Sequence, residues 1–156
     1  MASKTLLKIL FVVFSMIIAR EDIKTGAVPR IMFIIAFPFF VILKTLLYEK
    51  NMLPESIAGG FIGFIVFFLS YFLSNRSLGL ADVWYSMLIG LIMGPWRWYA
   101  AIGISCVAGA ICILAGKKRQ IPFIPYLAFG SIAIIFIGGF CNEEEKYFIS
   151  FIDSLF

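Results

Sequence analysis

The segment Phe61–Leu69 reads FIGFIVFFL and contains no charged or hydrogen-bonding side chain. A second segment, Ile31–Phe37, reads IMFIIAF and is equally apolar. A helix formed by either segment is apolar on every face, as expected for a helix surrounded by lipid. A membrane β-barrel would instead show alternating polar and apolar residues. The two segments therefore predict an all-α integral membrane protein.

The composition of the whole chain agrees with this prediction. Of its 156 residues, 62% are hydrophobic and 14% are charged, whereas soluble domains are about 45–50% apolar and about 25% charged. This excludes a soluble globular protein and a disordered one, and nucleic acid is not an expected partner. At about 20 residues per membrane helix, the chain is long enough for six spans and has no room for a soluble domain. We expect a single membrane-embedded domain over residues 1–156.

Hydropathy predicts six membrane-spanning helices, separated by short segments that contain charged residues, Gly or Pro. The first span has basic residues at its start, but no small-x-small cleavage site follows it, so we interpret it as a retained helix. The predicted spans are Thr5–Arg20, Pro29–Leu47, Ser56–Ser74, Leu80–Gly94, Trp98–Gly116 and Pro122–Phe140.

Small residues recur at helical spacing in two of these spans. Gly59 and Gly63 are four residues apart, and so are Ala101, Ser105 and Gly109. Small side chains let membrane helices approach closely, so we expect helix–helix contacts at these positions.

The C-terminal residues predict a short amphipathic helix at the membrane surface. Asn142 and Glu145 have the spacing of a capping box. Apolar residues follow on one face of the expected helix, as in helices that lie in the lipid interface: Phe148, Phe151, Ile152 and Leu155.

No cofactor or metal site is expected. The chain has no His, and its three cysteines, Cys106, Cys112 and Cys141, form no Cys-x-x-Cys pair. The usual zinc ligands are therefore missing or scattered, and no disulfide is predicted.

Acidic residues at membrane depth are candidates for function because burying them in lipid is costly. Six of the nine acids lie away from the predicted spans. Glu49 and Glu55 are in a loop, and four more are in the C-terminal tail: Glu143, Glu144, Glu145 and Asp153. Glu21 and Asp22 lie at the end of the first span, and Asp82 lies at the start of the fourth.

With six spans, Asp22 and Asp82 lie on the same side of the membrane. Two carboxylates at one depth can share a proton, so that one activates water while the other polarises a carbonyl. Three alternatives stay open from spacing alone. Asp82 is a suitable N-cap for the fourth helix, the pair would suit a small ion- or proton-translocating protein, and the chain could be a non-catalytic membrane scaffold.

Three segments resemble the type IV prepilin peptidases. Asp22–Pro29 is similar to the D-x6-P segment of that family, and Gly79–Val83 is similar to its G-x-G-D-V segment. Ile121–Gly130 resembles the family segment I-P-F-G-P-x-L-A-x-G. The resemblance extends over essentially the whole chain. It implies a membrane aspartyl endopeptidase that removes the leader peptide of pilin-like or flagellin-like precursors, with Asp22 and Asp82 as its catalytic pair.

The resemblance also implies a location and further site residues. Counts of basic residues on the two sides do not decide the orientation, but the family places the active site at the cytoplasmic face of the inner membrane, with the N-terminus outside. No cysteine tetrad is present, so methylation of the product is not implied. Substrate contacts are expected from residues beside the aspartates and at the start of the last span: Glu21, Pro29, Gly79, Ala81, Pro122 and Pro125.

Four residues depart from the family pattern. Ala81 replaces a Gly, and Ile124 replaces another. Trp84 stands where Lys is frequent, and Arg30 stands where Asn or Asp is frequent. We expect these differences to change the shape of the substrate pocket, and we expect strain at Ala81 if the backbone there needs angles that only Gly adopts.

Overall fold

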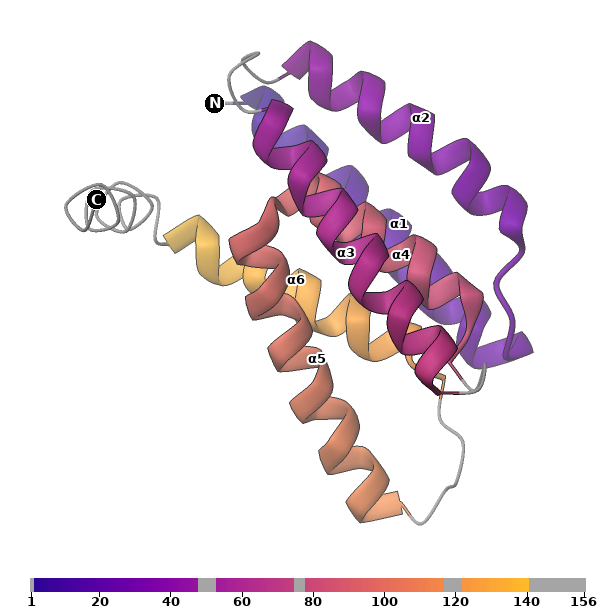
Figure 1. Ribbon diagram of the computed structural model, residues 1–156. Coiled ribbons are helices and arrows are strands. Elements are labelled where there is room, and N and C mark those ends of the chain that lie inside the picture. The colour runs from indigo at the N-terminus through magenta and orange to yellow at the C-terminus, as the bar shows by residue number, and fades with distance from the viewer. Residues whose placement is uncertain (1, 48–52, 75–77, 117–121, 141–156) are drawn as a thin grey trace, which may run out of the picture.

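The computed structural model describes residues 2–47, 53–74, 78–116 and 122–140, and these ranges form helices with short connections and no strand. The predicted C-terminal helix, which begins after Asn142, lies outside the described residues. So do Cys141 and Glu49. Figure 1 shows the arrangement of the helices, whose bounds are α1 Ala2–Thr25, α2 Arg30–Leu47, α3 Leu53–Leu73, α4 Leu80–Met93, α5 Pro95–Gly116 and α6 Ile124–Phe140.

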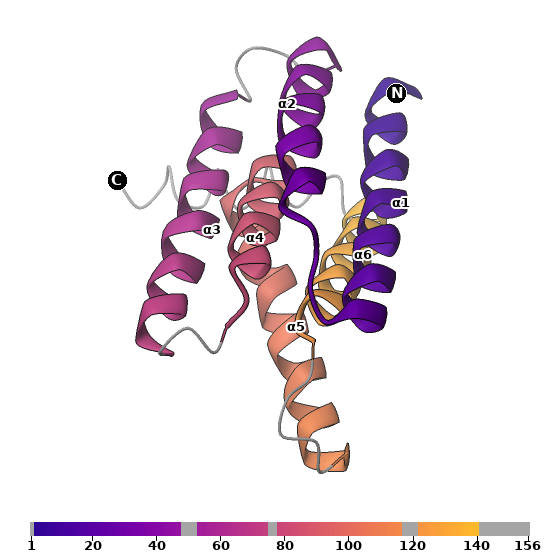
Figure 2. The same cartoon turned by 90° about the vertical axis from the view of Figure 1, so that its right-hand side faces the viewer.

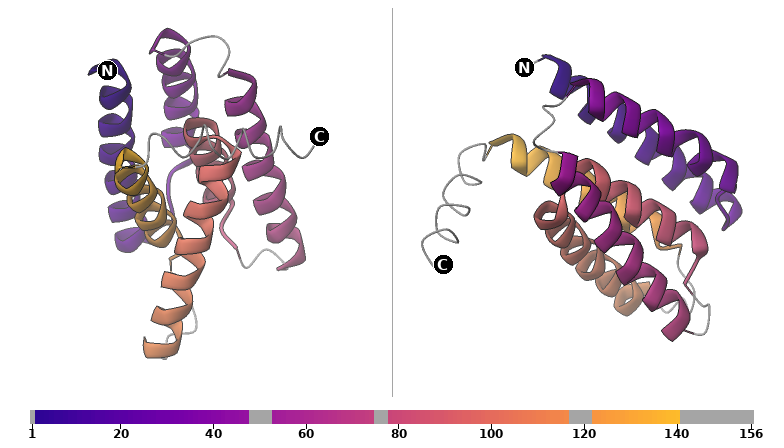
Figure 3. Two further views of the ribbon diagram at one scale, coloured as in Figure 1. Left: turned by 90° about the vertical axis from the view of Figure 1, so that its left-hand side faces the viewer. Right: turned by 45° about the horizontal axis from the view of Figure 1, so that its top comes forward.

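Helix α4 lies in the middle of the bundle, with α3 on one side and α1, α2 and α6 on the other (Figure 2). Its closest neighbour is α3, and it also contacts α2, α5 and α6. Helix α5 packs along α6 and then extends beyond the ends of the other helices (Figure 3). The central position of α4 explains why it is the most buried helix, with nine buried residues among its 14.

The predicted small-residue contacts are confirmed. A Cβ atom on Gly63 would lie 2.6 Å from the Ser86 carbonyl oxygen, and one on Gly59 would strike the backbone of Gly90 and Gly94. On the other side of the bundle, a Cβ atom on Gly130 would strike Ser105. The absence of side chains at these glycines is what lets α3 approach α4, and α6 approach α5.

The first helix is longer than hydropathy predicts. Helix α1 continues past Arg20 to Thr25 and ends where Gly26 adopts a φ of 65°, with the Gly26 amide donating to the Asp22 carbonyl at 2.9 Å. A left-handed glycine is a common helix stop. Loss of apolar character does not mark the end of the helix, so Asp22 lies inside α1 and not after it.

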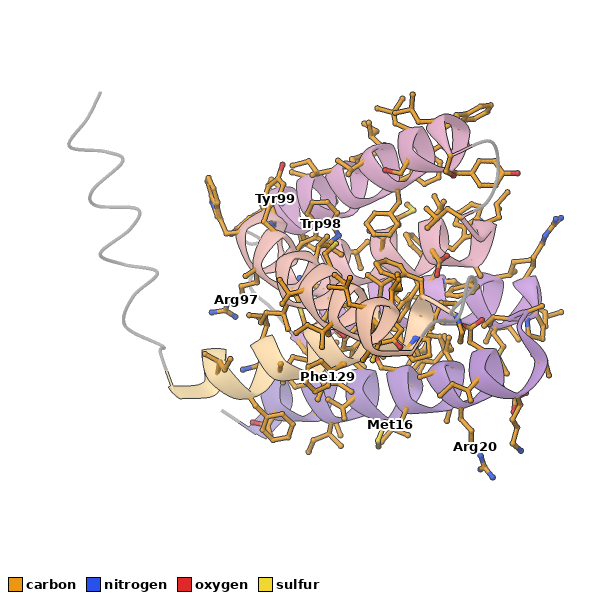
Figure 4. The ribbon with its side chains drawn as sticks, turned by 90° about the horizontal axis from the view of Figure 1, so that it is seen from below. Met16, Arg20, Arg97, Trp98, Tyr99 and Phe129 are labelled. Carbon is orange, nitrogen blue, oxygen red and sulfur yellow. The ribbon has the colours of Figure 1, made fainter. Side chains whose placement is uncertain are left out.

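Within the part of the chain that the structure describes, three helices are long and apolar enough to cross a membrane, namely Arg30–Leu47, Leu53–Leu73 and Pro95–Ala115. Helices α4 and α6 are apolar but shorter, and the 14 residues of α4 span about 21 Å, less than the roughly 30 Å of a hydrocarbon core. Met16, Tyr99 and Phe129 project from the outside of the bundle, each about half exposed (Figure 4). These features fit a membrane protein, while the six-span topology stays a prediction.

At the end of the bundle away from Asp82, Lys44 closes the C-terminus of α4. The Lys44 side chain is 4% exposed, and its Nζ donates to the carbonyl oxygens of Leu91 (2.7 Å) and Ile92 (2.8 Å). Carbonyls in the last turn of a helix have no partner within the helix, so a buried cation stabilises them. Glu55 was predicted to lie in a loop. It lies instead in the first turn of α3, beside Gly94.

We expect Lys44→Met to lower the free energy of unfolding by about 2–4 kcal/mol, because two charge-assisted hydrogen bonds are lost in a buried place. Thermal unfolding of the purified protein in detergent measures this. The control is Lys24→Met, which changes an exposed lysine in the last turn of α1. Equal stability of Lys44→Met and the unchanged protein would contradict the assignment.

Candidate active site

Asp22 and Asp82 line one cavity, although 60 residues separate them in the chain. The cavity has a volume of about 1000 Å³, and its walls come from α1, α2, α4, α5, α6 and the connections that precede α2, α4 and α6. The two carboxylates are near enough for their charges to interact. The structure thus brings together Asp22 and Asp82, which the count of predicted spans had placed on one side of the membrane.

Asp22 is held against the start of α6. Its side chain is 7% exposed, and its carboxylate accepts a hydrogen bond from the backbone amide of Ile124, the first residue of that helix. The first amides of a helix lack partners within the helix and carry a partial positive charge, so this place suits a carboxylate. The other oxygen, Asp22 Oδ2, is buried and has no hydrogen-bond partner among the described residues.

Asp82 is held in a similar way at the start of α4. Its side chain is 5% exposed, and Oδ2 accepts a hydrogen bond of 3.0 Å from the Gly79 amide. Gly79 is the N-cap and Asp82 is the third residue of the helix, which is the acidic half of a capping box. The capping alternative is therefore correct in part, although Asp82 caps from the third position, and the same carboxylate lines the cavity.

The structure separates the other predicted site residues into three groups. Gly79, Ala81 and Pro122 line the same cavity as the aspartates. Glu21 and Pro29 are not among its lining residues, and each residue along a helix turns by about 100°, so Glu21 points away from the direction of Asp22. Pro125 lines a neighbouring, mostly apolar cavity of about 390 Å³ between α1, α5 and α6.

A model of the type IV leader peptidase family matches residues 9–114. The chain belongs to the type IV leader peptidase family. The match includes both aspartates and the segments Asp22–Pro29 and Gly79–Val83, while Ile121–Gly130 lies beyond it. Searches of curated proteins and of solved structures find no match. Family membership indicates a peptidase of the aspartic type, and the cavity contains two buried carboxylates.

Two departures from the family pattern lie on the cavity wall. Arg30 places a cation there, and Trp84 places an indole ring there. The sequence indicated both positions, because each lies within or next to a matched motif. Cys106 and Tyr126 also line the cavity. Tyr126 lies within the family-like segment Ile121–Gly130, whereas no sequence signal indicated Cys106, which the packing of α5 brings to the site.

The condition under which strain was expected at Ala81 is not met. Ala81 is the second residue of α4, so its backbone has ordinary helical angles. Among the described residues, the glycines with positive φ are Gly26 and Gly94. A helical position accepts Ala without backbone cost, and the replacement of Gly by Ala therefore affects only the space at the cavity wall.

Proposed function

We propose that this chain is a membrane aspartyl endopeptidase that cleaves the leader peptide of type IV pilin-like or flagellin-like precursors. The observation that supports this most is the pairing of two buried carboxylates, from α1 and α4, on the wall of one cavity. Family membership supports leader peptides as the substrate class.

In the proposed reaction, Asp22 and Asp82 hold a water molecule between them. One carboxylate is ionised and takes a proton from the water as its oxygen attacks the scissile carbonyl carbon. The other is protonated and donates a hydrogen bond to the oxyanion that forms, because two adjacent carboxylates readily share one proton. Proton transfer to the leaving amine then completes the cleavage, and neither a covalent intermediate nor a cofactor is needed.

The helix starts that surround the pair would keep it in place for this reaction. The Ile124 amide fixes Asp22 from α6, and the Gly79 amide fixes Asp82 within its own capping box. Both bonds come from backbone donors, which do not rotate. Catalysis depends on such fixed geometry, because an error of about 1 Å can cost on the order of 100-fold in rate.

The proposed orientation places the connections after α1, α3 and α5 in the cytoplasm, at the inner membrane. A pilin-like precursor would keep its hydrophobic helix in the bilayer, while its basic leader approaches the cavity from the cytoplasm. Glu21 is half-buried near the C-terminal end of α1, next to Asp22 in the chain, and would attract the basic leader. Proline residues at the start of α6 would leave backbone groups available to an extended substrate.

Ion or proton translocation is the second candidate, and the position of the acids disfavours it. Asp22 and Asp82 lie at one end of the bundle, whereas Glu55 lies at the start of α3, beside Gly94 at the other end of α4. Among the described residues, no further acid lies along α4 between these two ends. A path for ions needs such intermediate groups.

Cleavage of a precursor tests the proposal directly. The purified protein is reconstituted in lipid vesicles with a pilin-like precursor, and mass spectrometry identifies the new N-terminus. We expect a shortened product that begins at the hydrophobic helix. An intact precursor, in an assay where another leader peptidase cleaves it, would contradict the proposal.

A substitution at Ala81 tests whether this wall of the cavity touches the substrate. We expect Ala81→Gly to keep most of the activity, because residue 81 is helical and only a methyl group is lost. Ala81→Val should lower kcat/KM by about 10–100-fold, because a branched side chain crowds the cavity next to Asp82. Leader cleavage is compared at equal amounts of folded protein. Equal rates for the three proteins would place residue 81 outside the substrate path.

A further inference from the structure

Three hydroxyl groups lie buried where α1, α4 and α6 meet. Ser15, Tyr85 and Ser131 are each 0% exposed, and the two serine hydroxyls lie next to that of Tyr85. The Tyr85 ring stacks on Phe11 with 6.4 Å between the ring centres. These three hydroxyls, the hydroxyl cluster, therefore form a polar site inside an otherwise apolar core.

The hydroxyl cluster lacks hydrogen bonds that its burial should require. Among the described residues, Ser15 Oγ and Tyr85 Oη have no hydrogen-bond partner. Ser131 Oγ donates to the Ala128 carbonyl at 2.9 Å, and a hydroxyl that donates can still accept. A buried hydroxyl without a partner is costly, and native proteins rarely tolerate one.

Another buried hydroxyl in the same bundle shows the usual arrangement. Ser86 Oγ donates to the Gly63 carbonyl at 3.2 Å and accepts from Trp98 Nε1 at 2.9 Å. Ser86 thus joins α3, α4 and α5 through direct bonds. The cluster of Ser15, Tyr85 and Ser131 also joins three helices, and its hydroxyls are close enough to interact, but Ser15 Oγ and Tyr85 Oη lack a hydrogen bond of ordinary geometry among the described residues.

We propose that Ser15, Tyr85 and Ser131 bind an internal water molecule that links α1, α4 and α6. Polar groups that face each other without a direct bond are commonly bridged by water. A buried water typically makes about three hydrogen bonds, and the hydroxyl cluster offers three partners. Each hydroxyl can donate as well as accept, so the water and all three groups can be satisfied together.

The water would join the same helices that hold the two aspartates. Ser15 precedes Asp22 by seven residues on α1, and Tyr85 follows Asp82 by three residues on α4. These spacings correspond to about two turns and one turn, which keeps the paired positions on one side of each helix. The third helix, α6, contributes the Ile124 amide to Asp22. The water site extends beyond the proposed peptidase function and does not depend on it.

Thermal unfolding of the purified protein in detergent tests the water site. We expect Tyr85→Phe and Ser15→Ala each to lower Tm by about 3–6 °C, because each removes a partner of the water. The double variant should lose less than the sum of the two, because both hydroxyls serve one water molecule. Phenylalanine keeps the ring on Phe11, so the variant retains the packing of the core.

The matched control is Ser105→Ala. Ser105 is also 0% exposed, but its Oγ bonds the Ala101 carbonyl of its own helix at 2.7 Å, so Tm should change little. A dry cluster predicts the opposite sign for the test variants, because removing an unpaired buried hydroxyl relieves its desolvation cost. An unchanged or raised Tm in Tyr85→Phe and Ser15→Ala would overturn the proposal.

Discussion

Asp22→Asn and Asp82→Asn are each expected to lower the rate of leader cleavage by about 1000-fold or more. An amide can neither take a proton from water nor share one with the remaining carboxylate. The fold should survive, because an Asn side-chain oxygen can still accept the hydrogen bond from the Ile124 or the Gly79 amide. Mass spectrometry of the precursor after a fixed time gives the rate, and thermal unfolding confirms that each variant is folded.

Glu21→Gln is the matched control for the aspartate variants. It removes one negative charge from the residue next to Asp22, on a side chain outside the cavity lining. We expect at most a modest rise in KM, through weaker attraction of a basic leader, with kcat unchanged. Near-normal cleavage by Asp22→Asn or Asp82→Asn would exclude the two-aspartate mechanism.

Gly90→Ala is expected to destabilise the bundle by about 3 kcal/mol, the upper part of the usual range for overpacking. The added Cβ would lie 2.6 Å from the Gly59 carbonyl carbon and 3.1 Å from the Gly60 nitrogen. Both are backbone atoms and cannot rotate away, so α3 and α4 must move apart. In a protein of this size the expected fall in Tm is about 6–12 °C. Asp82 lies on the same helix, so cleavage should fall as well.

Gly103→Ala is the control for the close approach of α3 and α4. Gly103 is also helical, but a Cβ there would meet nothing within 4 Å among the described residues. Since Ala favours the helix over Gly by about 1 kcal/mol, this variant should be as stable as the unchanged protein or more so. If Gly90→Ala were equally stable, the packing of α3 on α4 described above would be wrong.

Much of the fold follows from patterns that operate along the chain. Apolar runs predicted every described helix, because a helix that faces lipid needs apolar side chains on all sides. Spacing of four between small residues predicted the contacts of Gly59, Gly63, Ala101 and Ser105. The end of α1 was missed, since a helix can continue through charged residues until a glycine such as Gly26 stops it.

By itself, the sequence determined the two acids, the family and the helical membrane character. Asp22 and Asp82 were indicated because carboxylates are rare near lipid, and counting the predicted spans placed them on one side. Only the tertiary structure decided which groups surround them. The Ile124 amide reaches Asp22 across 102 residues, and Tyr126 reaches the cavity from α6, because helices distant in the chain pack together there. Side-chain type and spacing describe one helix at a time, whereas a site between helices depends on how their faces meet.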